Sequence, residues 1–323
     1  IESGGNYNVV VGDEAGTAIT TGDNNTFVGY TAGDANTTAG NNTAVGYASL
    51  TANTTGALNV AVGALALDAN QTGAANTAVG YNALSANTGD GATAVGKDAL
   101  ELNTTGANTA VGANSLATVT SGTSNVAVGN DALTVNTASN NTAVGASALI
   151  ANTTGDATTA VGKDSMKTNT TGRFNSALGY ESLALNTTGA NNVALGKAAL
   201  YSNTTASNNT AVGHSALIAN TTGSNNTAVG FNAGDALTTG INNTTVGSFS
   251  LSADTLGKFS VAVGNGALER QNFTSSTNVY NTAVGYDAGS RITTGIQNTL
   301  IGGLAGDAIT TGSYNSLVGV NAG

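Results

Sequence analysis

The chain lacks cysteine, proline and tryptophan, and it contains one methionine, Met166, and one histidine, His214. Without cysteine there are no disulfides, and a single histidine excludes a His- or Cys-rich metal site. Charged residues make up 8% of the 323 positions, against about 25% in ordinary soluble domains. The net charge is −10 and no basic patch is visible, which disfavours nucleic acid and anionic membranes as partners. No stretch approaches the roughly 18 apolar residues of a membrane helix, so we expect no membrane span.

One short phrase ending in Val-Gly, Leu-Gly or Ile-Gly recurs nineteen times. The interval between successive glycines is 17 residues in fourteen of the eighteen cases, 16 in three and 21 in one. The glycines are Gly12, Gly29, Gly46, Gly63, Gly80, Gly96, Gly112, Gly129, Gly145, Gly162, Gly179, Gly196, Gly213, Gly230, Gly247, Gly264, Gly285, Gly302 and Gly319. Self-similarity at this period predicts one structural unit stacked on itself. We therefore expect a non-enzymatic repeat protein without cofactor or metal.

Each copy resembles the consensus N-N-T-A-V-G-Y-x-A-L-x-x-N-T-T-G-x. Threonine and valine replace one another at the third residue before the glycine, and such β-branched residues are typical of a strand. The segment A-L-x-x-N fits a second extended piece or a single helical turn, and T-T-G fits a turn. Seventeen residues are too few for a helical or leucine-rich repeat. The sequence thus predicts one all-β domain over 1–323, a parallel β-solenoid (β-roll) of about nineteen coils, roughly 90 Å long.

Strand side chains alternate between two faces, so the valine column and the alanine column before each glycine lie on opposite sides. Either the valine column or the alanine column is therefore exposed as an apolar stripe, and we expect a second copy of the chain to cover it in a homo-oligomer. The fourth residue before the glycine is asparagine in sixteen copies. Stacked amides bond along a ladder and satisfy backbone groups at corners. We assign this structural ladder to Asn42, Asn59, Asn76, Asn108, Asn209 and Asn226.

The stretch Asn76–Leu84, N-T-A-V-G-Y-N-A-L, resembles the head repeats of trimeric autotransporter adhesins and the repeats of bacterial and phage tail-fibre-domain proteins. In the adhesins a shorter repeat forms a left-handed parallel β-roll that trimerises. The resemblance therefore implies a solenoid that associates with itself, with a trimer as one arrangement. The longer T-T-G turn of this chain departs from the adhesin pattern.

The residue after each glycine forms the column with most aromatic and basic members. We predict it to be a contact surface, for a surface glycan or for lateral packing of fibres. Its members are Tyr30, Tyr47, Tyr81, Lys97, Lys163, Tyr180, Lys197, His214, Phe231 and Tyr286. Acidic residues fall two and five positions after the glycine, but the G-G-x-G-x-D pattern of calcium-binding repeats is missing. The 21-residue interval adds a candidate recognition loop that includes Arg270 and Phe273.

These features favour an extracellular or cell-surface structural fibre or adhesin shaft. A phage tail-fibre shaft, located in the virion, and an ice-binding solenoid are the alternatives. Copies with Ala-Gly in place of Ala-Leu occur near both ends of the sequence, as at Ala15-Gly16 and Ala322-Gly323. Because no capping segment is visible at either end, we also expect head-to-tail polymerisation into filaments by strand addition.

Overall fold

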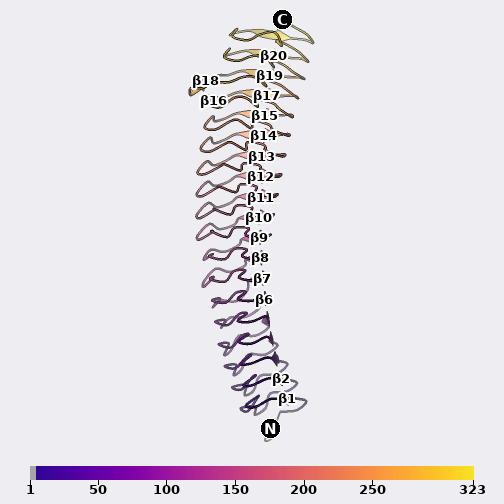
Figure 1. The fold of residues 1–323 in the computed structure, drawn as a ribbon, viewed down its shortest axis with the longest axis vertical. Coiled ribbons are helices and arrows are strands. Elements are labelled where there is room, and N and C mark those ends of the chain that lie inside the picture. The colour runs from indigo at the N-terminus through magenta and orange to yellow at the C-terminus, as the bar shows by residue number, and fades with distance from the viewer. Residues whose placement is uncertain (1–4) are drawn as a thin grey trace. The chain divides into compact units, whose positions relative to one another are not determined.

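The structure is a computed structural model that describes residues 5–323. These residues form short strands and turns and contain no helix. The chain divides into two compact units, one ending at Ala157 and the other beginning at Thr158. Each unit is a stack of coils of about 17 residues, with one parallel strand per coil, which confirms the predicted β-solenoid (Figure 1).

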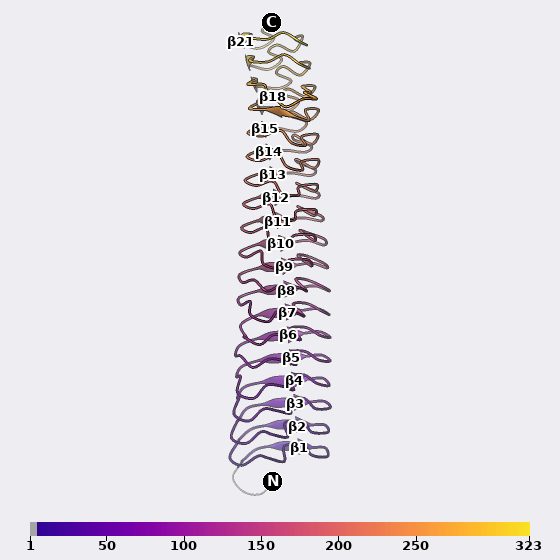
Figure 2. The same cartoon turned by 90° about the vertical axis from the view of Figure 1, so that its left-hand side faces the viewer.

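In the first unit, nine strands of the described residues pair in chain order, each parallel to the next (Figure 2). Equivalent residues of the repeat lie opposite each other, so Thr43 pairs with Val60 and Val45 with Val62. The strands are β1 (Val9–Val11), β2 (Thr26–Val28), β3 (Thr43–Val45), β4 (Val60–Val62), β5 (Thr77–Val79), β6 (Thr93–Val95), β7 (Thr109–Val111), β8 (Val126–Val128) and β9 (Thr142–Val144).

The second unit repeats this arrangement with ten strands within residues 158–323. They are β10 (Thr159–Val161), β11 (Ser176–Leu178), β12 (Val193–Leu195), β13 (Thr210–Val212), β14 (Thr227–Val229), β15 (Thr244–Val246), β17 (Val261–Val263), β19 (Thr282–Val284), β20 (Thr299–Ile301) and β21 (Ser316–Val318). A separate two-stranded sheet joins β16 (Gly257–Lys258) to β18 (Thr277–Asn278).

The middle residue of the strand, alanine in most coils, points into the coil and the valine after it points out, which decides between the two faces that the sequence left open. Ala78 is completely buried, whereas Val79 is 36% exposed. The small alanine side chain lets the strand lie close to the opposite wall of a coil that is only 17 residues around. Two further columns complete the interior: the small residue three positions after the glycine, such as Ala83, and the leucine after it, such as Leu84.

The segment A-L-x-x-N is neither the extended piece nor the helical turn that the sequence allowed. It is a run of turns in which the second and fourth residues after the glycine have positive φ, as at Ala48 (51°) and Leu50 (55°). Backbone groups of this run bond to the neighbouring coils: the Leu50 amide donates to the Ala66 carbonyl at 2.9 Å, and the Ala52 amide donates to that of Asp68 at 3.0 Å. These bonds and the burial of leucine offset the cost of left-handed backbone at non-glycine residues.

The repeat glycine ends each strand at a close approach between coils. Gly46 has φ of 142°, and a Cβ there would lie 2.5 Å from the carbonyl oxygen of Gly63. Both the backbone conformation and the contact require glycine. This explains why the position never varies while its neighbours do.

Candidate functional site

The predicted asparagine column lies inside the coils and connects each coil to the next. The backbone amide of Asn59 donates to Asn42 Oδ1 at 2.8 Å, and Asn59 Nδ2 donates to the Gly73 carbonyl at 2.8 Å. Asn76 repeats this pattern with Asn59 at 2.9 Å. The six predicted ladder residues, Asn42, Asn59, Asn76, Asn108, Asn209 and Asn226, are at most 1% exposed. Each amide therefore satisfies a buried backbone donor and a buried carbonyl at the same corner.

A second buried asparagine column, seven residues after the glycine, was not identified from the sequence. Here the side chains bond directly to one another: Asn53 Nδ2 donates to Asn36 Oδ1 at 2.8 Å, and Asn70 Nδ2 donates to Asn53 Oδ1 at 3.0 Å. The same nitrogen of Asn53 also reaches the Gly56 carbonyl at 2.9 Å. The signal was present as the asparagine of N-T-T-G. Because Asn53 is completely buried, its Asn-Thr-Thr sequence offers no accessible acceptor for glycosylation.

The predicted contact column is exposed at all ten of its named positions: Tyr30, Tyr47, Tyr81, Lys97, Lys163, Tyr180, Lys197, His214, Phe231 and Tyr286. Two adjacent pairs stack along the coils. The ring centroids of Tyr30 and Tyr47 are 5.7 Å apart, and those of His214 and Phe231 are 5.4 Å apart. In each pair one ring face is covered by its neighbour, which leaves ring edges and single faces for contact. His214 Nδ1 also lies 2.9 Å from the Ser215 hydroxyl.

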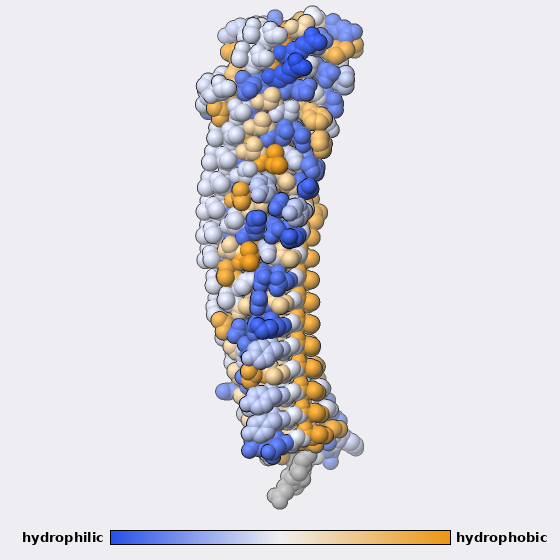
Figure 3. All heavy atoms as spheres, viewed as in Figure 1, coloured by the Kyte–Doolittle hydropathy of each residue, from blue (hydrophilic) through white to orange (hydrophobic). Residues whose placement is uncertain are grey.

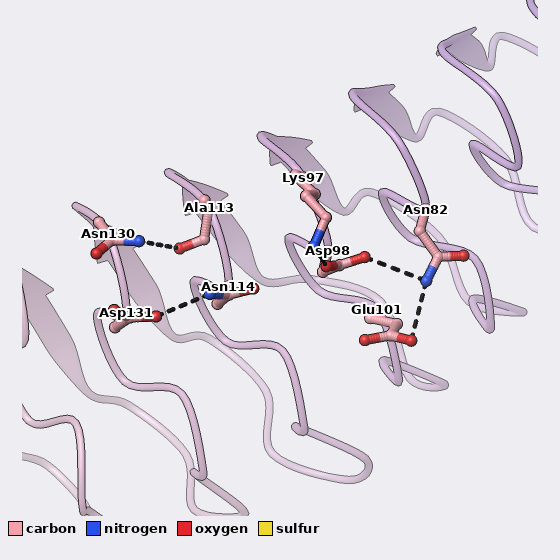
Figure 4. A network of polar contacts seen from close by, with 8 residues as sticks. All are labelled: Asn82, Lys97, Asp98, Glu101, Ala113, Asn114, Asn130 and Asp131. Atoms are coloured by element: carbon pink, nitrogen blue, oxygen red, sulfur yellow. Dashed lines mark hydrogen bonds and ion pairs between the residues drawn. The ribbon is translucent and has the colours of Figure 1, made fainter.

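Acidic residues beside this column are held by amides and lysine (Figure 4). Asn82 Nδ2 donates to Glu101 at 2.9 Å, and Lys97 Nζ lies 2.6 Å from Asp98. The hydrogen bond to Asp98 raises the pKa of Lys97 above its usual value. A hydrogen bond to Glu14 likewise raises the pKa of Tyr30.

Asn114 donates to Asp131 at 2.9 Å in the same way (Figure 4). Among residues 5–323, no group of three or more His, Asp or Glu side chains is placed to hold a metal ion.

The 21-residue interval contributes β18, which pairs with β16 of the preceding coil, and its Tyr280 stacks on Phe259 of that coil with ring centroids 5.1 Å apart. Arg270 is exposed, as a recognition residue must be. Phe273 is only 7% exposed and packs into the coil, so it is not available as the contact that we expected. The insertion moves its extra residues outward and keeps the aromatic side chain inside.

Below this loop the second asparagine column changes to Asp254 and Gln271. Gln271 Nε2 donates to Asp254 Oδ2 at 2.6 Å, and the Phe273 amide donates to Asp254 Oδ1 at 3.0 Å. Burial raises the pKa of the Asp254 carboxyl, and the hydrogen bond from Gln271 opposes that shift. Gln271 Oε1 in turn accepts from Asn281 Nδ2 at 2.8 Å, which continues the polar core across the insertion.

The outer face of the strands carries no charge in any copy. From the fifth residue before each glycine to the glycine itself, none of the nineteen copies contains Asp, Glu, Lys, Arg or His, although the chain has 26 acidic and basic residues. We call this surface the strand face. Its valine and threonine columns are partly or fully exposed, and an apolar stripe is visible along the N-terminal coils (Figure 3). Charge is thus excluded from one side of the repeat and confined to the others.

Fold and surface together define a β-solenoid repeat protein with one charge-free side. No protein-family model and no curated protein matches this chain. In the described part of the chain, no helix is long and apolar enough to cross a membrane.

Proposed function

We propose that the protein is a non-enzymatic structural shaft, extracellular or at a cell surface, whose copies associate side by side through the strand face. The solenoid supplies the shaft, because backbone bonds connect each coil to the next around the whole perimeter. Repeated short units of this kind extend without a large globular core. Stability then comes from stacking rather than from disulfides, which the sequence lacks.

The observation that carries the proposal is the absence of charge from the strand face. A protein with net charge −10 repels its own copies, and a charge-free side is where that repulsion is weakest. The valines there remain substantially exposed, 38% at Val111 and 36% at Val128. Over the nine coils of the first unit, a stripe about 10 Å wide and 4.8 Å per coil amounts to about 400 Å², close to the largest patch that monomers normally leave open.

Light scattering of the purified protein across a range of concentrations tests this function, with electron micrographs of the same samples. We expect defined oligomers or laterally paired shafts at micromolar concentration. A protein that stays monomeric at all concentrations, with isolated particles in the micrographs, contradicts the proposal.

A second function, binding to ice, is favoured by the threonines of the same face. In the described coils their hydroxyls, such as that of Thr77, donate no hydrogen bond to the protein, whereas the hydroxyl of Thr54 in the T-T-G turn donates to Gln71 at 3.0 Å. The strand face thus presents free hydroxyls beside valine methyls, repeated once per coil. Such a surface suits an ordered water layer.

Substitution by a residue that the repeat already uses separates the two functions. Thr77→Val and Thr93→Val remove hydroxyls and place valine where Val60 and Val126 stand in other copies. If ice is bound, wild type shows thermal hysteresis and the double variant loses most of it. If the face serves only self-association, wild type shows no hysteresis and the variant associates at least as strongly.

A further inference from the structure

The sixth residue after each repeat glycine is uncharged in sixteen of the eighteen copies that contain it. Alanine is the usual residue there, as at Ala52 and Ala69. The two exceptions are Arg270 and Arg291, which lie in the consecutive coils before and after the only four-residue insertion in the chain. The change to arginine therefore coincides with the one lengthened coil of the repeat.

The two coils are joined at this point, which brings the arginines together. The backbone amide of Arg270 donates to the carbonyl of Ser290 at 3.1 Å, directly beside Arg291. Adjacent coils of this kind are about 4.8 Å apart. Both arginine side chains are exposed.

Neither guanidinium is neutralised by the protein. Among the described residues, neither arginine side chain takes part in an ion pair or a hydrogen bond with another residue. The acids Glu269 and Asp287 lie nearby in sequence and Asp307 lies in the following coil, and among the described residues none of them comes within ion-pair distance of either arginine. Two cations in register repel each other unless an anion lies between them.

We propose that Arg270 and Arg291 form a binding site for the carboxylate groups of an acidic polysaccharide. Two guanidiniums in register offer forked donors that match the planar geometry of a carboxylate. The insertion adds the exposed hydroxyls of Thr274, Ser275 and Ser276 close by in sequence, and hydroxyls suit a sugar.

A sparsely charged polysaccharide fits better than a nucleic acid. Nucleic acid carries about one charge per 1.7 Å of duplex and needs an extended basic surface, whereas this chain has a net charge of −10 and one arginine pair. The site rests on the arginines alone and is independent of the strand face. Its failure therefore leaves the proposed self-association untouched, and the converse also holds.

The test is a titration of the full chain with an oligogalacturonate of about ten residues, followed by the arginine side-chain NMR signals and by calorimetry. We compare wild type with Arg270→Ala and Arg291→Ala, which restore the usual residue of this column, and with Arg173→Ala, which removes an equal charge at an exposed position elsewhere. We expect saturable shifts at Arg270 and Arg291. Each of the first two variants should bind about tenfold more weakly, and Arg173→Ala should bind like wild type.

Equal binding by wild type and both site variants overturns the proposal. So does the absence of any saturable shift, or an equal loss in Arg173→Ala, which indicates a response to net charge only. A neutral maltodecaose that binds as well as the acidic probe removes the role of the carboxylate. Tighter binding of single-stranded DNA of equal charge assigns the site to nucleic acid instead.

Discussion

The ring of Phe27 occupies the space that a side chain at Gly33 would need. A Cβ placed on Gly33 would lie 2.7 Å from three ring atoms of Phe27. In the next coil the equivalent positions hold Ala44 in the strand and Leu50 in the turn. A large strand residue is therefore combined with a glycine in the turn, and a small strand residue with a leucine. The same combination occurs at Leu300 and Gly306, where a Cβ placed on Gly306 would lie 2.8 Å from a methyl carbon of Leu300.

This combination predicts a coupled pair of substitutions. Phe27→Ala should cost about 3–5 kcal/mol, because it leaves a cavity against a glycine. Gly33→Leu alone should cost about 1–3 kcal/mol through overpacking. The double variant restores the usual alanine and leucine and should recover at least half of the loss of Phe27→Ala. Denaturant unfolding of the four proteins measures the coupling, and strictly additive effects would contradict it.

The asparagine column four residues before the glycine predicts that two neighbouring asparagines, Asn42 and Asn41, differ greatly in their contribution to stability. Asn42→Ala should destabilise its coils by about 1–3 kcal/mol, because it leaves the Asn59 amide buried without a partner and leaves the Gly56 carbonyl with only the Asn53 side chain as donor. Asn41→Ala is the matched control: Asn41 is exposed, and Ala75 has the same backbone conformation in another copy. Amide hydrogen exchange in the adjacent coils should rise strongly in the first variant and little in the second. Equal effects would mean that the ladder contributes nothing specific.

Asp254 predicts how the stability of its coils depends on pH. Burial raises its pKa in the folded state above the ordinary 3.8 of the unfolded chain. At pH values between 3.8 and the folded-state pKa, the folded state therefore binds more protons than the unfolded state. The stabilisation is therefore fully present below pH 3.8 and lost as pH rises through the folded pKa. Relative to Asp254→Asn, wild type should gain stability as pH is lowered through this window. Denaturant unfolding of both proteins at several pH values gives the difference, and a constant difference would contradict the raised pKa.

The period, the strand and the glycine were predictable because the repeat displays them nineteen times. Because strand side chains alternate between two faces, the sequence showed that Ala78 and Val79 point to opposite sides. It could not show which of them faces the interior of the coil, because both are apolar. The turn after the glycine was not predictable for another reason. Positive φ at Leu50 runs against the preference of leucine, and only the bonds between coils make it favourable.

The sequence predicted which residues make up the candidate site, but it did not predict correctly which of them are exposed to a partner. Exposure of the column that includes Tyr81 agrees with its variable polar, aromatic and basic composition. Phe273 was expected to be a loop contact, because an insertion on a solenoid is normally exposed. Its burial reflects the need to fill the coil beneath the insertion. The pairing of Arg270 with Arg291 becomes apparent only when the register across the longer coil is known.

Sedimentation velocity of charge variants tests the central claim, association through the strand face, most directly. Val79→Lys with Val111→Lys places two cations on that face. Ala64→Lys with Ala113→Lys adds the same charge in the column where lysine already occurs at Lys97. Wild type and the alanine-site variant should sediment as the same oligomer, and the valine-site variant should sediment as a monomer. Identical sedimentation of all three proteins would contradict the account.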